Sequence, residues 1–208
     1  MDEGTIRRSF EGRSWGWIIP YQFISAAAHN PGFEDLLESA MFKCLGNEEP
    51  IKEAVSLLVD ISGSMDSRIS RKSEVMRYDV AAGLAVLLRE ICTDIKLYVF
   101  NDKLFEIPPR RGFALRDAIT KNAGGGTNMW ESIRSAGKDR RNRVMIVITD
   151  EQTMDRGNYS DANSDLLVII NVASYQNGVG YEKGVVHING WSDSVIYWLR
   201  EYLKTEFE

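Results

Sequence analysis

The 208-residue chain is expected to form an α/β domain with a mainly parallel central sheet and helices on both of its faces. Three nearly continuous apolar runs, at residues 54–60, 143–150 and 165–172, are rich in β-branched residues. Such runs are typical of strands that are buried on both faces. Segments whose apolar residues recur at helical spacing separate these runs along the chain. The alternation of strands and helices therefore predicts a doubly wound fold.

Residues 1–50 are expected to form a tail with a short helical extension, and residues 51–208 the α/β domain itself. The first 15 residues are polar and contain Gly and Arg. Two helices should follow, separated at Asn30-Pro31-Gly32, because Pro and Gly interrupt a helix. In the second helix the apolar residues recur from Phe33 to Cys44, and Gly46 is its expected end. These helices need a surface to pack against, so they belong either to the α/β domain or to a domain that is missing here.

The other elements of the α/β domain follow in a regular order. We expect helices at residues 71–91, 114–120 and 128–136, and strands at residues 96–100, 103–108 and 184–188. A helix that begins at Ser192 or Asp193 should close the chain, with Val195, Trp198, Leu199 and Tyr202 on one side.

The composition is that of an ordinary globular protein, with 44% hydrophobic and 26% charged residues. The net charge of −5 argues against a chain that binds nucleic-acid phosphates over its whole surface. Cys44 and Cys92 are far apart, form no CxxC pair and are expected to be buried free thiols. The chain has neither an apolar N-terminal segment nor a membrane-spanning run, so we expect a cytoplasmic protein that makes no membrane contact.

Polar side chains follow two of the predicted strands and one glycine-rich turn. Asp60, Ser62 and Ser64 form an Asp-x-Ser-x-Ser loop after the first strand, and Asp150 ends the run at 143–150. Thr127 follows three glycines, which permit a tight turn. In sheets of this kind ligands bind beyond the carboxyl ends of the strands. The two carboxylates and three hydroxyls are hard oxygen donors, which suit Mg²⁺.

In type and in order, these five residues resemble the metal-ion-dependent adhesion site of the von Willebrand factor type A (vWA) family. The resemblance implies a Rossmann-like vWA fold. It also implies that Ser62 and Ser64 ligate Mg²⁺ directly, Thr127 directly or through water, and Asp60 and Asp150 mostly through water. Mn²⁺ or Ca²⁺ could replace Mg²⁺. With few direct negative ligands the cation stays electrophilic, so an exposed Asp or Glu of a protein partner can complete its coordination shell.

Longer strings resemble one branch of this family. The segments "VFNDKLFEIP", "AGGGTN" and "ITDEQT" are similar to the C-terminal vWA domain of the Ro autoantigen (TROVE-domain) family. The segment "IIPYQFISAAAHNPGFEDLLESAM" is similar to the helical seam that joins this family's RNA-binding ring to its vWA domain. The resemblance implies a place in a Ro-like ribonucleoprotein that holds a small noncoding RNA. We expect the chain to be the vWA half, either cut from a longer protein or a stand-alone relative.

Each site residue also has a plainer interpretation. The Asp-x-Ser-x-Ser loop could simply cap the next helix, and the glycine-rich turn could hold a phosphate. Ser62 or Ser64 could act as a nucleophile, but that requires a base, and neither His29 nor His187 belongs to a recognisable triad motif. We therefore expect no enzymatic activity.

A second group of residues consists of candidates for partner binding. Arg68, Arg71 and Lys72 follow the Asp-x-Ser-x-Ser loop and could attract an acidic partner or a nucleic-acid phosphate. Trp130 could face a partner or belong to the core, and Glu151 could be a further ligand or a charge at the rim. Three functions remain open: metal-dependent binding of a protein, direct binding of RNA phosphates, and a structural role with a vestigial site.

Overall fold

The computed structural model describes residues 21–43, 49–70, 73, 75–108, 110–140, 142–173 and 184–207, together with Thr5, Arg8 and Phe10. The predictions for Cys44, Gly46, Arg71 and Lys72 lie outside these residues.

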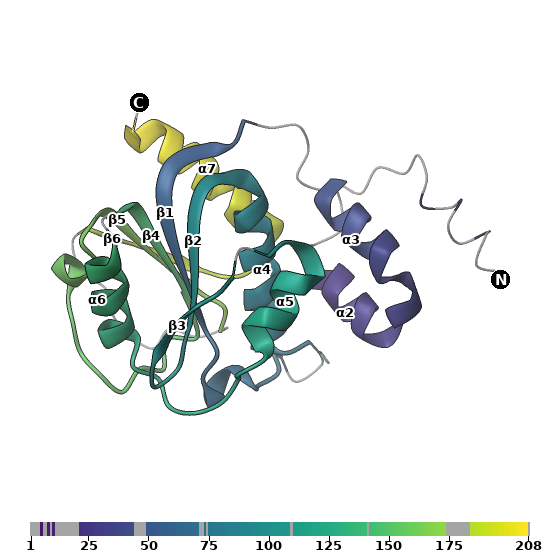
Figure 1. Ribbon diagram of the computed structural model, residues 1–208, viewed down its shortest axis with the longest axis horizontal. Helices are drawn as coiled ribbons and strands as arrows, with labels where there is room; N and C mark the ends of the chain where they lie inside the picture. Colours follow the sequence, from purple (N-terminus) through teal and green to yellow (C-terminus); the bar gives the residue numbers. More distant parts are fainter. Residues whose placement is uncertain are drawn as a thin grey trace.

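A six-stranded sheet in the order β3-β2-β1-β4-β5-β6 forms the centre of the molecule (Figure 1). Its strands are β1 (Ile51–Asp60), β2 (Cys92–Phe100), β3 (Leu104–Glu106), β4 (Asn142–Thr149), β5 (Ser164–Asn171) and β6 (Val185–Asn189). All neighbouring strands are parallel except β2 and β3, which form an antiparallel pair. The predicted α/β fold with a mainly parallel sheet is confirmed.

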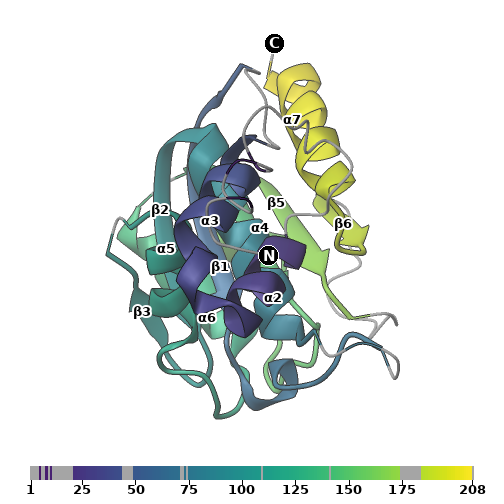
Figure 2. The same ribbon diagram turned by 90° about the vertical axis from the view of Figure 1, so that its right-hand side faces the viewer.

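Helices cover the two faces of the sheet unequally. One face packs against α4 (Arg77–Ile91), α5 (Gly112–Thr120) and α7 (Asp193–Phe207) in a large core, whereas α6 (Met129–Asp139) covers the other face (Figures 1 and 2). Successive strand residues point to opposite faces, so Leu57 enters the larger core and Leu58 the smaller one. Both faces of the central strands are therefore buried, which explains their continuous apolar runs.

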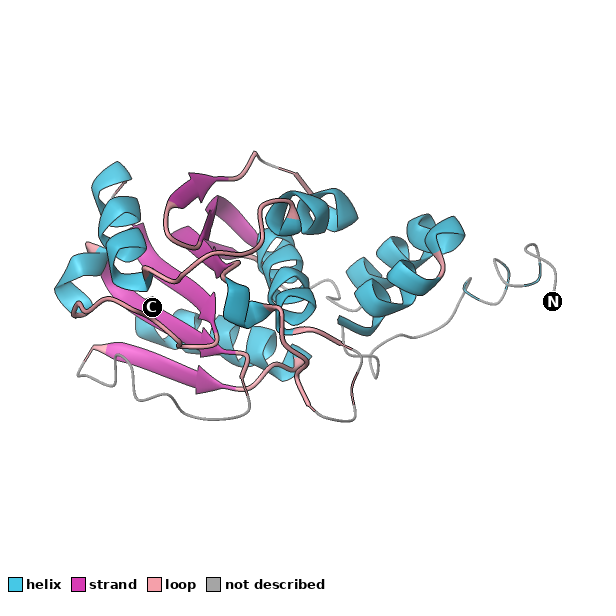
Figure 3. Cartoon of the chain, turned by 90° about the horizontal axis from the view of Figure 1, so that it is seen from below, coloured by secondary structure: helices cyan, strands magenta, loops and turns pink. Residues whose placement is uncertain are grey.

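The predicted helical extension is present as α2 (Tyr21–His29), a 3₁₀ turn (Pro31–Phe33) and α3 (Glu34–Lys43). The interruption falls at the predicted Asn30-Pro31-Gly32. The two helices lie side by side at one edge of the molecule (Figure 3). Phe23, Ile24 and Met41 are nearly inaccessible and belong to the same core as α4 and the sheet. The extension therefore packs on the α/β domain. Its assignment as an appendage or as a seam to a missing domain, and the boundary at residue 50, stay predictions.

Three local expectations need correction or detail. The helix predicted from residue 71 begins at Arg77, because Met76 is extended (φ −92°, ψ 157°) and its N–H is bound by Asp79 Oδ2 at 3.2 Å. Trp198 does not share the buried side of α7: it is 46% exposed and stacks on Tyr202, with 4.9 Å between ring centroids. Cys92 is a buried free thiol as predicted, and burial raises its pKa to about 12.

None of the helices in the described part of the chain is long and apolar enough to cross a membrane.

Candidate metal centre

The three predicted site segments meet at the carboxyl end of β1 and β4, at the bottom of the view in Figure 1. Asp60 is the last residue of β1, and Asp150 directly follows β4, its parallel neighbour. The loop after β1 is joined to the glycine-rich turn by two backbone hydrogen bonds. Gly63 N–H donates to the Gly125 carbonyl at 3.0 Å, and Gly124 N–H donates to the Ile61 carbonyl at 2.7 Å.

A chain of hydroxyl and carboxylate oxygens lies at this end of the sheet. Ser62 Oγ and Ser64 Oγ are 3.1 Å apart, and Ser64 Oγ donates to Asp150 Oδ1 at 3.1 Å. Neighbouring ligands of an octahedral Mg²⁺ are separated by about 3 Å when each lies about 2.1 Å from the ion. The donor set and its spacing therefore fit a hard divalent cation. Among the described residues no three His, Cys, Asp or Glu side chains gather around a point, so a cation here would depend on the hydroxyl groups.

Asp60 is fully buried and fixes the loop that carries the two serines. Its Oδ1 accepts the Ser62 N–H at 2.8 Å, and its Oδ2 accepts the Thr149 hydroxyl at 2.6 Å. Burial raises the pKa of Asp60 to about 6, and the charge of Asp150 acts in the same direction, against the hydrogen bonds from Ser62 and Thr149. The carboxylate is therefore ionised at neutral pH at a considerable desolvation cost, which a nearby cation would reduce.

Thr127 is placed by its backbone. Gly124 (φ 120°) and Gly125 (φ 89°) adopt conformations that favour glycine and turn the chain toward the loop after β1. The Thr127 carbonyl accepts hydrogen bonds from Met154 N–H at 2.9 Å and from the Thr153 hydroxyl at 3.2 Å, and Thr127 itself is 4% exposed. The turn that carries Thr127 is thereby held between the loops that follow β1 and β4.

Arg77, which the sequence interpretation missed, belongs to this site. Its Nη1 donates to Asp150 Oδ2 at 2.6 Å and to the Ser64 carbonyl at 3.2 Å. The Arg77 side chain is 10% exposed and that of Asp150 is inaccessible. A sequence signal was present, because Arg77 lies at helical spacing from Val80 and Leu84 on the apolar side of α4. An arginine on such a side requires a buried partner.

Two residues considered for partner binding are buried. Trp130 is 2% exposed and packs in the smaller core, which confirms its core interpretation and leaves no surface for a partner. Glu151 is 1% exposed, and its Oε1 lies 3.1 Å from His187 Nδ1, so the interpretation as a charge at the rim is wrong. The physical reason is a tight turn after β4: Glu151 has a φ of 59°, and its N–H donates to Thr149 Oγ1 at 3.0 Å.

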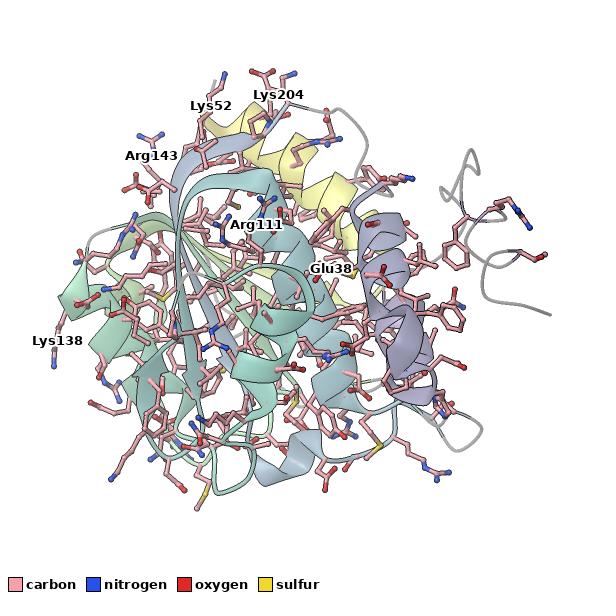
Figure 4. The ribbon with its side chains drawn as sticks, turned by 45° about the vertical axis from the view of Figure 1, so that its right-hand side comes forward. Glu38, Lys52, Arg111, Lys138, Arg143 and Lys204 are labelled. Carbon is pink, nitrogen blue, oxygen red and sulfur yellow. The ribbon has the colours of Figure 1, made fainter. Side chains whose placement is uncertain are left out.

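The basic residues divide between the two ends of the sheet. Arg68 is exposed and lies in the loop that follows the serines. Arg143 lies at the opposite end of the sheet, near Lys52 and Lys204 (Figure 4), where β4 begins. Arg140 and Arg111 form ion pairs with Asp94 and Glu90. Arg140 and Arg143 are therefore remote from the candidate metal centre.

Comparisons with known proteins support the fold. No family model matches the chain. The Ro (RSR) protein of Deinococcus radiodurans superposes with a TM-score of 0.70 at 17% identity, over 99% of this chain and 46% of its own. An aerotolerance-related membrane protein of Bacteroides fragilis superposes with a TM-score of 0.56 at 15% identity, over 73% of this chain and 98% of its own. The RNA-binding protein RO60 of Caenorhabditis elegans is 32% identical over 74 residues, which are 36% of this chain and 11% of that protein.

The sheet and these structural likenesses define the class: the chain has a vWA-like α/β fold. Within that class it is similar to the Ro proteins, as the sequence motifs predicted. The chain spans less than half the length of the Ro structure and about a ninth of the length of RO60.

Proposed function

We propose that this domain binds a divalent cation, Mg²⁺ in the first instance, and uses it to capture an acidic side chain of a protein partner. Ser62, Ser64 and Thr127 would hold the ion, and Asp60 and Asp150 would bind its water ligands. The observation that carries the proposal is the chain of oxygens from Ser62 through Ser64 to Asp150, with successive separations of 3.1 Å. When bound, the ion supplies a Lewis-acidic position that a carboxylate can occupy.

The protein's own groups prepare this position. Asp150 accepts the Ser64 hydroxyl proton, so the lone pairs of Ser64 Oγ remain available to a cation. Asp60 accepts the Ser62 N–H and thereby holds the backbone of the loop in place. Both carboxylates are buried. In this proposal they supply negative charge close to the ion while leaving a position for the partner's carboxylate.

We propose binding rather than catalysis for this site. A serine nucleophile needs a base within hydrogen-bond reach. His29 lies in α2, where its Nδ1 is 2.8 Å from the Ser25 carbonyl, and His187 Nδ1 is 3.1 Å from Glu151 Oε1. The contacts described for Ser62 Oγ and Ser64 Oγ are with each other and with Asp150, a pattern expected of ligands.

We further propose that the domain works within a Ro-like ribonucleoprotein. The likeness to the Deinococcus radiodurans Ro protein and to the RNA-binding protein RO60 supports this assignment. In such an assembly the domain would contribute a protein-binding site and a different part would hold a small noncoding RNA. Direct phosphate binding by this domain has narrower support, because Arg68 is exposed in the loop after the serines, whereas the Arg77 side chain is 10% exposed and is paired with Asp150.

Metal binding is tested by chemical denaturation with and without Mg²⁺ or Mn²⁺. A site saturated at a hundred times its Kd should raise the free energy of unfolding by about 2.7 kcal/mol. The double variant Ser62→Ala/Ser64→Ala should lose this increase and keep its fold, whereas Ser135→Ala, on α6, should retain it. The absence of any shift in the wild type at millimolar Mg²⁺ and Mn²⁺ would contradict the proposal.

Direct RNA binding makes a different prediction. Affinity for a small RNA should then fall steeply as salt concentration rises, and Arg68→Gln should weaken it. If the protein partner is the ligand, EDTA should abolish association with that partner while Arg68→Gln leaves RNA affinity unchanged.

A further inference from the structure

We propose that Arg77 sets the charge of the candidate metal centre: it weakens binding of the cation and makes the loaded site selective for a carboxylate. This inference rests on the proposed metal-dependent function and adds a residue that tunes it. Arg77 contacts Asp150, which would bind the ion's water ligands, and the Ser64 carbonyl, so it acts through other residues and is a positioning residue.

The position of Arg77 is determined by its own element. It is the first residue of α4, and its backbone N–H donates to the Ser67 carbonyl at 2.9 Å. The helix start is thus tied to the same loop that carries the two serines. From this anchor the guanidinium reaches Asp150 Oδ2 at 2.6 Å and the Ser64 carbonyl at 3.2 Å. The cationic side chain is built into the site rather than lying at its rim.

Both oxygens of the Asp150 carboxylate have donors. Oδ2 accepts from Arg77, while Oδ1 accepts from the Ser64 hydroxyl and, at 3.2 Å, from Gln152 N–H. A carboxylate that is already paired with a guanidinium attracts a second cation less strongly. Arg77 therefore already neutralises part of the negative charge of Asp150, which would otherwise be available to a divalent ion.

The same charge has the opposite effect on an anionic ligand. Asp60 and Asp150 offset the charge of a divalent ion, and the guanidinium makes the loaded site one unit more positive than it would be without Arg77. A more positive, largely desolvated site attracts a carboxylate more strongly. Arg77 thus lowers the affinity of the site for the metal ion and raises the affinity of the loaded site for the partner's acidic group.

The experiment measures Mn²⁺ affinity of the full chain by electron paramagnetic resonance. Arg77→Gln should bind Mn²⁺ roughly tenfold more tightly than the wild type, because a repulsive charge near the ion is removed. A residue with a purely structural role would change affinity in the other direction. Arg140→Gln makes the same charge change beside Asp94, at the far end of the sheet, and should leave Mn²⁺ affinity unchanged.

Acetate serves as the probe for the carboxylate. Its binding to the Mn²⁺-loaded protein is followed by water-proton relaxation, because acetate displaces a bound water. The wild type should bind acetate several-fold more tightly than Arg77→Gln. Equal acetate affinities would overturn the selectivity part of the inference.

A conservative variant covers the case in which Arg77→Gln does not fold. Arg77→Lys keeps the charge and should bind Mn²⁺ within about threefold of the wild type, whereas a tenfold tightening would overturn the inference. If neither the wild type nor Arg77→Gln binds Mn²⁺, the proposed function itself is wrong. If both bind it equally, only the role of Arg77 is wrong. Binding by Arg77→Gln alone would support the role of Arg77 and contradict metal binding by the natural chain.

Discussion

The Asp60 carboxyl of the candidate metal centre has a raised pKa. It is fully buried, and its pKa is raised to about 6 because burial penalises the charged form more than its two hydrogen bonds stabilise it. In the native state this carboxyl therefore holds its proton more tightly than in the unfolded chain. The metal-free protein should consequently lose stability as the pH rises from about 4 to about 6, and a bound cation should restore it.

Asp60→Asn tests this linkage. The pKa rises by about two units, from the ordinary 3.8, so the penalty at neutral pH is roughly 3 kcal/mol at about 1.4 kcal/mol per unit. In EDTA the variant should match the wild type near pH 4 and exceed its free energy of unfolding by up to about 3 kcal/mol at pH 7.5. Urea denaturation at both pH values measures the difference. A difference that is the same at both would show that Asp60 is not the titrating group.

The glycine-rich turn shows how one loop positions another. Gly125 has a φ of 89°, and a Cβ atom there would lie 2.7 Å from Asp102 Oδ2. Its carbonyl accepts the Gly63 N–H, so a shift of the turn would also move the loop that carries Ser62 and Ser64. The conformational freedom of glycine therefore lets the turn that carries Thr127 lie against the loop that carries the two serines.

We expect Gly125→Ala to lower the free energy of unfolding by about 1–3 kcal/mol and to weaken Mn²⁺ binding, because alanine disfavours this φ. Gly32→Ala is the matched control, since nothing lies within 4 Å of a Cβ at that position, and it should change neither quantity appreciably. Thermal unfolding and a Mn²⁺ titration of both variants measure the effects. Equal behaviour of the two would contradict this role of the turn.

The contact between α3 and α5 joins the extension to the α/β domain. Glu38 Oε1 accepts the N–H of Phe113 at 2.7 Å, and Arg116 pairs with Glu34 at 2.9 Å. The Phe113 N–H lies in the first turn of α5, where it has no acceptor within the helix. Because Phe113 is nearly inaccessible, water cannot easily replace Glu38 as the acceptor of this N–H. A single side chain of α3 thus satisfies a backbone donor of another element.

Glu38→Ala should cost about 1–3 kcal/mol, because it leaves this buried N–H without its acceptor. Glu38→Gln keeps an amide oxygen at the same place and should recover most of that loss. Hydrogen exchange at α3 and α5 is the direct measurement, and faster exchange is expected in the alanine variant. Unchanged protection in Glu38→Ala would show that other contacts hold the extension in place.

One hydrophobic core extends from the extension through α4 to the sheet. Phe23, Ile24 and Met41 are at most 3% exposed and belong to the same cluster as Leu57 on β1. Burial of each such side chain contributes about 1.5–3 kcal/mol. Together, the buried side chains of the extension therefore contribute a free energy comparable with the entire free energy of unfolding of a typical domain.

A chain that begins at residue 49 should consequently be much less stable than the full chain, with a loss of at least about 5 kcal/mol. Its unfolding midpoint in urea should fall sharply, and exposure of the α4 surface should promote aggregation. The full chain should unfold in a single transition, since its core is shared. A truncated chain with the midpoint of the full chain would show that the extension is only an appendage.

The pattern of residues along the chain was sufficient for the fold and for much of the candidate site. Continuous apolar runs located the central strands, Pro and Gly located the break at Asn30-Pro31-Gly32, and apolar periodicity located the helices between the strands, because these features depend on neighbours within a few residues. The same reasoning placed Asp60 and Asp150 at adjacent strand ends, since parallel strands align their carboxyl ends.

Contacts between distant segments depended on tertiary packing. Arg77 pairs with a carboxylate 73 positions later, and Glu151 turns inward to His187, 36 positions away. Trp130 fills the smaller core because α6 lies flat on that face of the sheet. Spacing along the chain shows which side of its own element a residue occupies. The side chain opposite it is determined only when the elements pack, and that packing brought a guanidinium to the candidate metal centre.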